Sequence, residues 1–470
     1  MEDFLNVLLH GTEAFSGFIW TYIVIGMLFS CGIYMSFKTG FVQFKRLGTA
    51  IKFVALGAKK EDSKRAEGDI TPFQALMTAL AATVGNGNIA GVATAIIAGG
   101  PGAPLWMWLT ALFGMSTKYA EGLLGLKYRQ KLADGTYTGG AMYYLQEISN
   151  KKVGRFFAIW FALALMFMAT FGSGNMAQSN SIALALNSDF GVDFSVTGIL
   201  LFVLLSLILI GGVKRIAVVA EKLVPAMIVL YMGAGLTIIL MNLPLIPEVF
   251  SIVIESAFNP QAAGGGFVGL TIREALRYGV ARGTLSNESG IGSCSMPAAA
   301  AKGNEAAAQG LVAMMGTFID TILVCTMTTF VILSSGVSLD GTLDSVALTK
   351  TAFGNNLGAS GGTIISICSA VFGFTTLIGW AYFGEQGFRY LYKNLNVNIY
   401  RGIFCVFAGI GTILQGKYLG IVWNFGDIAN ALLAIPNIIG LFMLGNVVKN
   451  VTQDYFKRFD SGEMKNPFGY

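Results

Sequence analysis

The segment from Thr78 to Trp108 is an apolar run that Gly85-Asn86-Gly87-Asn88 interrupts near its middle. Glycine is unfavourable inside helices, and lipid cannot satisfy the amide of asparagine, so a lipid-facing helix should not carry this cluster. We expect a broken membrane helix, with N–H groups free to bind a carboxylate at the positive end of the following half-helix. The cluster could instead serve close helix packing, as we expect for Gly91. The ligand-binding residues expected in this segment are Thr83, Gly85, Asn86, Gly87 and Asn88.

A pair of amides, Asn175 and Gln178, occurs within the sequence FGSGNMAQSNSIALAL. Their spacing of three residues puts both side chains on one face of a helix. Inside a membrane each amide needs hydrogen-bond partners, which either a binding pocket or a neighbouring helix can supply. We expect both residues to contact the ligand, with packing between helices as the alternative.

Two carboxylates, Asp320 in GTFIDTILV and Asp427 in WNFGDIAN, are the ionisable groups expected nearest the membrane interior. Such residues are functional candidates by default, although both could belong to polar networks that hold helices together. Glu288 and Glu305 are expected in solvated loops.

Metal and nucleophile chemistry find little support in the sequence. The single histidine, His10, lies near the N-terminus outside the apolar runs. The cysteines are scattered without a CxxC pair, which argues against a metal site or a disulfide framework. They are Cys31, Cys294, Cys325, Cys368 and Cys405.

The composition indicates what positions these residues. Of 470 residues, 54% are hydrophobic and only 12% are charged, and the mean hydropathy is +0.64. Apolar runs of helix-spanning length cover most of the chain. We expect residues 1–470 to form a single transmembrane domain in the lipid bilayer. The start of the chain, MEDFLNVLLHGTEAF, lacks the basic region of a cleavable signal peptide.

The apolar runs predict an all-α membrane protein with about eleven transmembrane helices. The seventh is expected to be interrupted. The predicted spans are 14–37, 72–98, 104–126, 155–187, 195–212, 216–241, 247–281, 306–335, 361–384, 401–416 and 419–448.

The distribution of Lys and Arg predicts the orientation of these spans. Eight of them fall in residues 38–65, and further ones lie in alternate loops, whereas the opposite set of loops holds only Lys350 and Lys417. Because cytoplasmic loops are enriched in Lys and Arg, we expect the N-terminus outside and the C-terminus in the cytoplasm. This bias accounts for the net charge of +5, so we predict no nucleic-acid partner.

A second interruption, FNPQAAGGGFVG at 258–269, lies five spans after the first. Paired interruptions in corresponding positions are typical of inverted-repeat transporters with a site at the bilayer midplane. We therefore expect an extra N-terminal helix at 14–37, inverted repeats at 72–241 and 247–448, and a cytoplasmic tail at 449–470. The second break adds Gly265 and Phe258 to the expected site, and Trp380 is expected to close the pocket with Phe258.

The stretch RGTLSNESGIGSCSMP, residues 282–297, is also rich in glycine and serine. It follows three arginines that would be costly at the midplane. We place it in a cytoplasmic loop.

Several long stretches resemble the alanine or glycine:cation symporter family, also called the sodium:alanine symporters. The most specific is GNIAGVATAIIAGGPGAPLWMWLTALFGMSTKYAEGLLGLKYR, with YGVARGTLSNESGIGS, GLVAMMGTFIDTILVCTMT and TTLIGWAYFGEQ in support. The resemblance implies a leucine-transporter-type fold, which is a 5+5 inverted repeat here preceded by one extra helix. Asn86 stands where the family more usually has threonine.

The resemblance also implies an ion site and a pocket. Sodium prefers hard oxygen ligands. In the related fold an adjacent hydroxyl pair on the eighth core helix supplies some of them, and Thr375-Thr376 matches it. Unwound carbonyls at Ala81 and Val84 would supply others. The segment containing Gln178 lines the pocket in the family.

The expected function is symport of small amino acids, chiefly alanine or glycine, with sodium, or alternatively protons, in the plasma membrane. We expect no enzymatic activity, no organic cofactor, no metal other than sodium, and a functional monomer. An ion or solute channel is the alternative from another class. A membrane enzyme is the third class, for which the sequence offers no catalytic residues.

Overall fold

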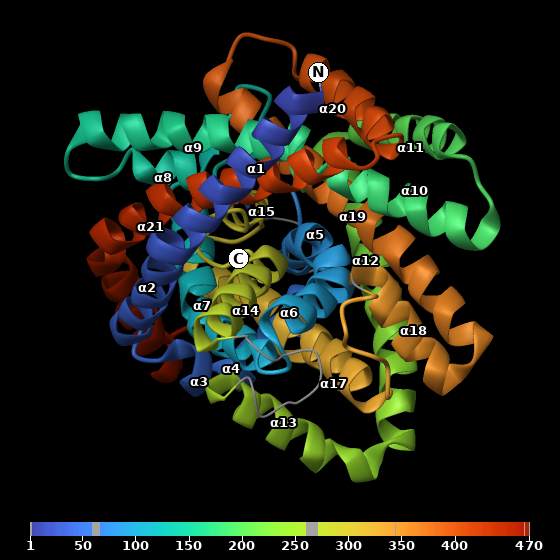
Figure 1. Ribbon diagram of the computed structural model, residues 1–470. Helices are drawn as coiled ribbons and strands as arrows, with labels where there is room; N and C mark the ends of the chain where they lie inside the picture. Colours follow the sequence, from blue (N-terminus) through green and yellow to red (C-terminus); the bar gives the residue numbers. More distant parts are fainter. Residues whose placement is uncertain (1, 59–65, 260–270, 344, 465, 470) are drawn as a thin grey trace.

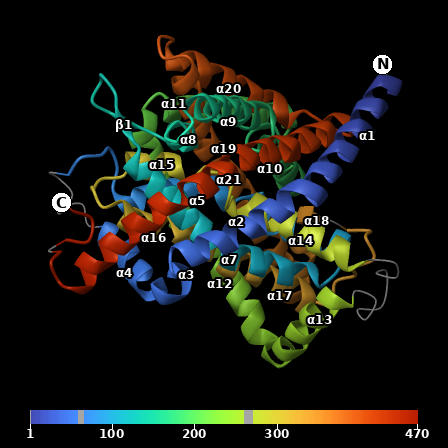
Figure 2. The ribbon, with the colours of Figure 1, turned by 90° about the vertical axis from the view of Figure 1, so that its left-hand side faces the viewer.

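The computed structural model describes residues 2–58, 66–259, 271–343, 345–464 and 466–469, and it is almost entirely helical in these ranges. Four helices precede the first predicted repeat, and a π-helical turn, Trp20–Val24, joins the first two of them. They are α1 (Glu2–Ile19), α2 (Ile25–Lys38), α3 (Val42–Lys45) and α4 (Leu47–Gly57). In Figures 1 and 2, α1 and α2 lie along α21 (Lys417–Asp460).

The first predicted repeat contains seven longer helices and one short one. They are α5 (Pro72–Thr83), α6 (Val92–Gly99), α7 (Ala103–Lys127), α8 (Ala141–Leu145), α9 (Lys151–Phe171), α10 (Met176–Phe190), α11 (Phe194–Leu209) and α12 (Gly212–Met241). Between α7 and α8, a small antiparallel hairpin pairs β1 (Gln130–Lys131) with β2 (Tyr137–Thr138).

The second predicted repeat begins after a 3₁₀ turn at Leu243–Leu245. A π-helical segment, Phe318–Cys325, joins α16 (Ala306–Thr317) to α17 (Thr326–Ser334). The helices of this second repeat are α13 (Ile246–Phe258), α14 (Ile272–Asn287), α15 (Ser295–Ala300), α16 (Ala306–Thr317), α17 (Thr326–Ser334), α18 (Ser345–Leu357), α19 (Ala359–Leu391), α20 (Val397–Thr412) and α21.

Many of these helices have the length and apolarity of membrane spans. Among the described residues, six continuous helical segments qualify, and α5 with the segment Gly87–Gly99 forms a seventh, bent pair. Large apolar side chains are exposed on the outer helices, for example Ile199, Val229 and Leu240. Such exposure would be unfavourable in water but suits contact with lipid. The predicted all-α membrane architecture is confirmed.

Helices α5 and α14 both begin with a capping box. Thr71 caps α5 and Thr271 caps α14, and each side chain accepts a hydrogen bond from the backbone N–H three residues later. The side chains of Gln74 and Glu274 accept the N–H of the capping threonine in return. Both helix starts therefore satisfy part of their free N–H groups locally.

The two capped helices run in opposite directions. Near the start of α5, the Asp69 N–H donates to the Ala300 carbonyl at the end of α15, and the Lys302 N–H donates to the Ile70 carbonyl. Beyond the end of α5, Asn88 bonds to Ser286 at the end of α14. The chain after α14 thus returns along α5 antiparallel to it, as an inverted repeat requires.

The centre of the molecule is built around α7. Figure 1 shows α5, α6, α7 and α14 near the middle of the view, with α9, α10, α13, α18 and α21 around them. Small residues on one face of α7 allow close contact with its neighbours. A Cβ built on Gly122 would lie 2.5 Å from the Cβ of Ala313, and one on Gly125 would lie 2.3 Å from the Ser295 carbonyl oxygen.

The C-terminal segment folds back onto the end of the molecule where α5 begins. Phe468 is buried against the ring of Phe53, and its carbonyl accepts the N–H groups of Asn304 and Glu305. Arg458 forms a two-pronged ion pair with Glu305 at 2.8 and 3.0 Å. Figure 2 shows the N- and C-termini at opposite ends of the molecule.

Close packing at Gly122 predicts a large effect of added volume. We expect Gly122→Leu to lower the free energy of unfolding by about 1–3 kcal/mol, because overpacking displaces α16. The melting temperature of detergent-purified protein measures this effect. The matched control is Gly233→Leu, since Gly233 lies in α12 with no neighbouring atom within 4 Å of its added Cβ. Equal melting temperatures for the two variants would show that the contact is not tight.

Candidate functional site

The first predicted break is present and follows α5. The chain turns extended at Val84, with ψ of 95°, and continues as a π-helical turn, Gly87–Gly91, bent by 53° from α5. The Gly85 N–H would bond to the Ala81 carbonyl in a continuous helix, but it donates instead to Oδ1 of Asn88 at 2.9 Å. The break therefore releases the Ala81 carbonyl from the helical ladder.

A second break separates α14 from α15, where the sequence predicted a cytoplasmic loop. Helix α14 ends at Asn287, Glu288 adopts the left-handed conformation with φ of 54°, and α15 begins at Ser295. All residues from 286 to 301 are buried. The prediction of a solvated Glu288 is therefore wrong, because only 2% of this residue is exposed.

The spacing of the arginines explains that error. Arg273 donates to the hydroxyl of Tyr22 near the exposed start of α14, and Arg282 pairs with Asp427 at 3.8 Å. At 1.5 Å per residue, Glu288 lies about 9 Å further along the helix axis than Arg282. The charged part of α14 thus stays outside the region that the break occupies.

The two breaks are joined by a buried polar cluster around Asp320. The Asn88 amide donates to Asp320 Oδ1 at 2.7 Å and to Ser286 Oγ at 2.9 Å. Ser286 and Thr321 each donate to Asp320 Oδ2 at 2.8 Å. Asp320 is fully buried in this network, so the carboxylate links the first break to the end of α14.

Two charged residues of α7 hold the second break, and sequence reasoning missed both. Glu121 Oε1 accepts the N–H groups of Gly290 and Gly292 at 3.0 Å each and the Asn437 amide at 2.8 Å. Lys118 Nζ donates to the Asn287 carbonyl at 2.8 Å. Both side chains are fully buried. Their spacing of three residues on an apolar helix was the available signal.

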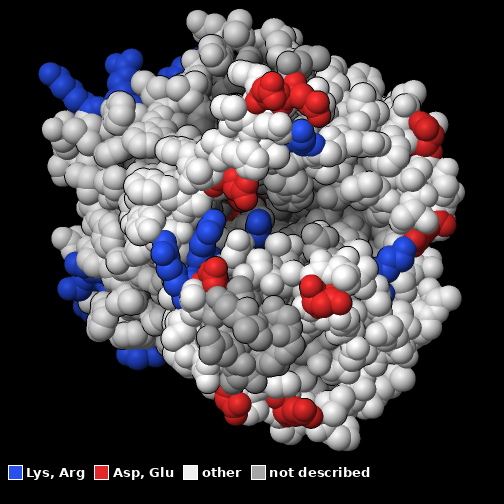
Figure 3. All heavy atoms as spheres, viewed as in Figure 1, with Lys and Arg blue, Asp and Glu red and all other residues white. Residues whose placement is uncertain are grey.

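A cavity of about 670 Å³ lies where the breaks meet α9, α10, α19 and α21. The surface in Figure 3 is hollowed near the centre of the view, with acidic and basic side chains at the rim. The lining includes residues predicted for the substrate or ion site, together with Glu288, Arg282, Asp427 and Asn430. The predicted residues in the lining are Thr83, Gly85, Asn86, Gly87, Gln178, Thr376 and Trp380.

Some polar side chains of the cavity wall are hydrogen-bonded to one another, and others have no hydrogen-bond partner. Asn86 donates to Gln178 Oε1 at 3.2 Å and accepts the hydroxyl of Ser369 at 2.7 Å. In the described part of the chain, Thr83 Oγ1 and both side-chain polar atoms of Asn430 have no hydrogen-bond partner. Polar groups without a partner in the wall of a cavity are suited to the recognition of a small polar ligand.

The predicted ion-site residues differ in where they point. A Cβ on Gly85 would lie 2.4 Å from Thr376 Oγ1, so the missing side chain lets this hydroxyl approach the first break. The Thr375 hydroxyl lies 3.5 Å from the Met227 sulfur on α12 instead. Both hydroxyls also donate to the Phe372 carbonyl. Ala81 and Val84 are fully buried at the end of α5.

Other predicted contacts lie elsewhere. Asn88 points into the Asp320 cluster, and the Asn175 amide donates to the Phe404 carbonyl on α20, which is the packing alternative. The prediction that Phe258 closes the pocket is wrong: at the end of α13 it is 57% exposed and contacts Trp106. Gly265 and most of the predicted break at 258–269 lie outside the described residues.

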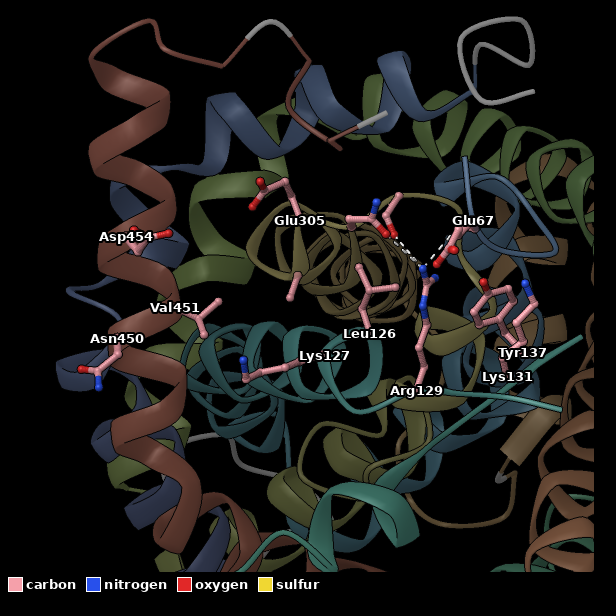
Figure 4. A pocket seen from close by; sticks show the side chains of 13 residues that line it. Glu67, Leu126, Lys127, Arg129, Lys131, Tyr137, Glu305, Asn450, Val451 and Asp454 are labelled. Carbon is pink, nitrogen blue, oxygen red and sulfur yellow. Dashed lines mark hydrogen bonds between the residues drawn. The ribbon is translucent and has the colours of Figure 1, made fainter. Parts of the chain in front are cut away.

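A second cavity, of about 750 Å³, lies at the end where the C-terminal segment packs. Figure 4 shows Arg129 pointing toward Glu67 within a lining of mixed charge. The Arg129 guanidinium donates to the backbone carbonyls of Ala301 and Gly303 at 2.7 and 3.1 Å. The lining of this cavity contains no residue of either break, and its Arg129 binds the loop between α15 and α16. Glu305, predicted to be solvated, is partly buried there and paired with Arg458.

Comparisons with known proteins cover nearly the whole chain. The sequence profile of the sodium:alanine symporter family matches residues 5–468. A sodium/alanine symporter, AgcS, of Methanococcus maripaludis is 42% identical over 455 residues, which cover 96% of this chain and 98% of that protein. A probable sodium/glutamine symporter, GlnT, of Bacillus subtilis is 34% identical over 468 residues, covering 99% and 94%.

Solved structures agree on the fold. MhsT in complex with L-phenylalanine superposes with a TM-score of 0.52 at 12% identity, covering 82% of this chain and 99% of MhsT. At this identity the likeness concerns the fold alone. The predicted leucine-transporter-type fold is confirmed.

The bonds of Glu121 predict its contribution to stability. In Glu121→Ala the N–H groups of Gly290 and Gly292 lose their acceptor, and each unsatisfied buried group costs about 1–3 kcal/mol. We expect a clear fall in the melting temperature of purified protein. Glu147→Ala is the control, because Glu147 forms an exposed pair with Lys151, and such pairs contribute about 0–1 kcal/mol. A melting temperature equal to that of the control would mean that α7 does not support the second break.

Proposed function

Because the chain belongs to the sodium:alanine symporter family, we propose that it couples inward sodium flow to the uptake of small amino acids, chiefly alanine or glycine. Family membership makes it a multi-pass membrane protein of cation-coupled amino-acid transport and excludes an enzyme. The choice of alanine rests on the relative named for sodium and alanine, against another named for glutamine. Alternating access of the cavity between the two sides of the plasma membrane would provide the transport.

The cavity at the first break is the observation that carries this proposal. Gly85 and Gly87 line it without side chains, so a substrate carboxylate can approach the backbone at the positive end of the segment Gly87–Gly99. Gln178 lies on the opposing wall and is held by Asn86. Trp380 packs against Gly174 and forms an aromatic wall of the cavity. This wall would limit the size of the substrate side chain.

For the ion, we infer a site between the first break and α19. Sodium prefers oxygen ligands, and the Ala81 and Val84 carbonyls with the Thr376 hydroxyl are the candidates that the break brings to this position. Thr375 contributes through packing against Met227 rather than as a ligand. Ion and substrate would then share one unwound segment, so that each increases the affinity of the protein for the other by the same factor.

We infer that the N-terminus lies outside and the C-terminus in the cytoplasm, from the eight Lys and Arg of residues 38–65, which precede α5. Because α14 runs opposite to α5, its arginines then lie toward the outer side and not in the cytoplasmic loop that the sequence predicted. The cavity is lined partly by α18 and by the start of α21, which border the loops poor in Lys and Arg. In this orientation, the cavity opens outward.

Uptake into proteoliposomes tests the function. We expect labelled alanine to accumulate above its external concentration only with an inward sodium gradient. Potassium replaces sodium in the control, and a proton gradient without sodium tests the alternative ion. Equilibration without accumulation would indicate a channel, and accumulation driven by protons alone would contradict sodium coupling.

The two neighbouring threonines provide a matched pair for the ion site. We expect Thr376→Ala to raise the sodium concentration for half-maximal uptake by about tenfold, because it removes one ligand worth about 1.4 kcal/mol. Thr375→Ala should leave the sodium titration close to wild type. Both are measured at saturating alanine. Equal shifts in the two variants would show that they act through the packing of α19.

A further inference from the structure

Glu288 combines three unusual properties. It is the first residue after α14, it adopts a left-handed backbone conformation that non-glycine residues rarely take, and it is buried yet lines the cavity. Backbone strain of this kind persists only where the surrounding structure enforces it, and it gathers at functional sites. The strained turn directs a carboxylate toward the cavity at the second break.

The carboxylate of Glu288 lacks a cationic partner. Its Oε2 accepts the hydroxyl of Ser293, and within the described residues no Lys or Arg lies within ion-pair distance of it. Lys118, on the adjacent α7, directs its ammonium group to the Asn287 carbonyl. Burying a carboxylate is unfavourable unless a cation or several donors compensate it.

The other acids near the cavity already have partners. Asp427 is paired with Arg282, and Asp189 with Lys350. Asp320 accepts bonds from three side chains, and Glu121 binds the backbone of the second break. Two of the acids in the described residues line the cavity itself, Glu288 and Asp427, and of these two Glu288 is the one without an ion pair.

The position of Glu288 relative to the first break indicates which cation it meets. A Cβ on Gly87 would lie 3.4 Å from the Cα of Ser286, two residues before Glu288. A ligand whose anionic group meets the N–H groups of the first break therefore has its other end within reach of the second. An α-amino acid carries both charges, separated by a single carbon.

We propose that the Glu288 carboxylate accepts the ammonium group of the transported amino acid. This rests on the proposed function, and it adds the residue that recognises the positive end of the substrate. Recognition by Glu288 then requires an ammonium group on the ligand in addition to the carboxylate. The sodium ion occupies a different position, at the first break and Thr376.

Binding of L-alanine and L-lactate to purified protein at saturating sodium tests the proposal. Lactate keeps the carboxylate and the methyl group but replaces the ammonium by a hydroxyl. We expect the wild type to prefer alanine strongly. In Glu288→Gln alanine affinity should fall by at least about tenfold while lactate affinity changes little, so that the preference largely disappears. Glu288→Asp should retain the preference with weaker binding.

Other outcomes overturn the proposal in distinguishable ways. Unchanged alanine binding by Glu288→Gln with a shifted sodium titration would assign the carboxylate to sodium, and loss of only the pH dependence of uptake would assign it to a proton. An equal loss of alanine and lactate binding would indicate a structural role. If neither variant can be purified in monodisperse form, the wild type alone still tests the proposal. An affinity for L-alanine that exceeds its affinity for L-lactate by less than about tenfold overturns the proposal.

A failure of the proposed function appears at an earlier step. A wild type that binds L-glutamine rather than alanine contradicts the proposed substrate. The same pair of variants then tests Glu288 with glutamine, which carries the same ammonium group. A wild type that binds no α-amino acid overturns both proposals.

Discussion

Every part of this structure depends on satisfying the backbone of two unwound segments inside a membrane domain. Each unpaired N–H or C=O group there costs several kcal/mol, so a transporter can expose backbone to a ligand only if protein covers the remainder. The second break meets this requirement through Glu121, which binds the N–H groups of Gly290 and Gly292. The first break uses its own Asn88 as an internal acceptor for the Gly85 N–H.

The two breaks are consequently supported in different ways. The second rests on α7, where a lysine and a glutamate are buried without direct contact with the cavity. The first is tied to the second through Asn88, Ser286 and Asp320 but leaves its glycines open on the cavity side. The bonds from α7 thus hold the second break in place. At the first break, a bound ligand can pair with the backbone groups that are left open. Charged residues beneath a site can be as important as those that line it.

The sequence predicted most of this arrangement where the signal was local. Most of the long apolar runs correspond to helices, although the predicted span 155–187 covers both α9 and α10 and the span 247–281 covers parts of α13 and α14. The first break was visible because glycine and asparagine interrupt an apolar run. Seven predicted site residues line the cavity, Gln178, Thr376 and Trp380 among them.

The second break was misplaced because its evidence is tertiary. Three arginines precede it, and their cost depends on how far along α14 they lie and on the partner that Asp427 offers Arg282. Neither can be read from spacing alone. Lys118 and Glu121 were overlooked for the same reason, since their partners are backbone groups of a segment about 170 positions away. The packing of Asn175 against α20 likewise depends on a helix that is distant in the sequence.

The threonine caps of α5 and α14 have a mechanical consequence. Each cap closes the first turn of its helix with bonds between the capping threonine and the residue three positions later, so part of the hydrogen bonding at the helix start is internal to the helix. A half-helix with such a cap can tilt as a rigid body without unwinding at its N-terminal end. The helical hydrogen-bond pattern is interrupted just after Val84 and Glu288, so a change of helix direction there breaks fewer backbone bonds than one inside α5 or α14. Tilting of α5 or α14 would therefore change the geometry at the cavity while the capped first turn keeps its internal hydrogen bonds.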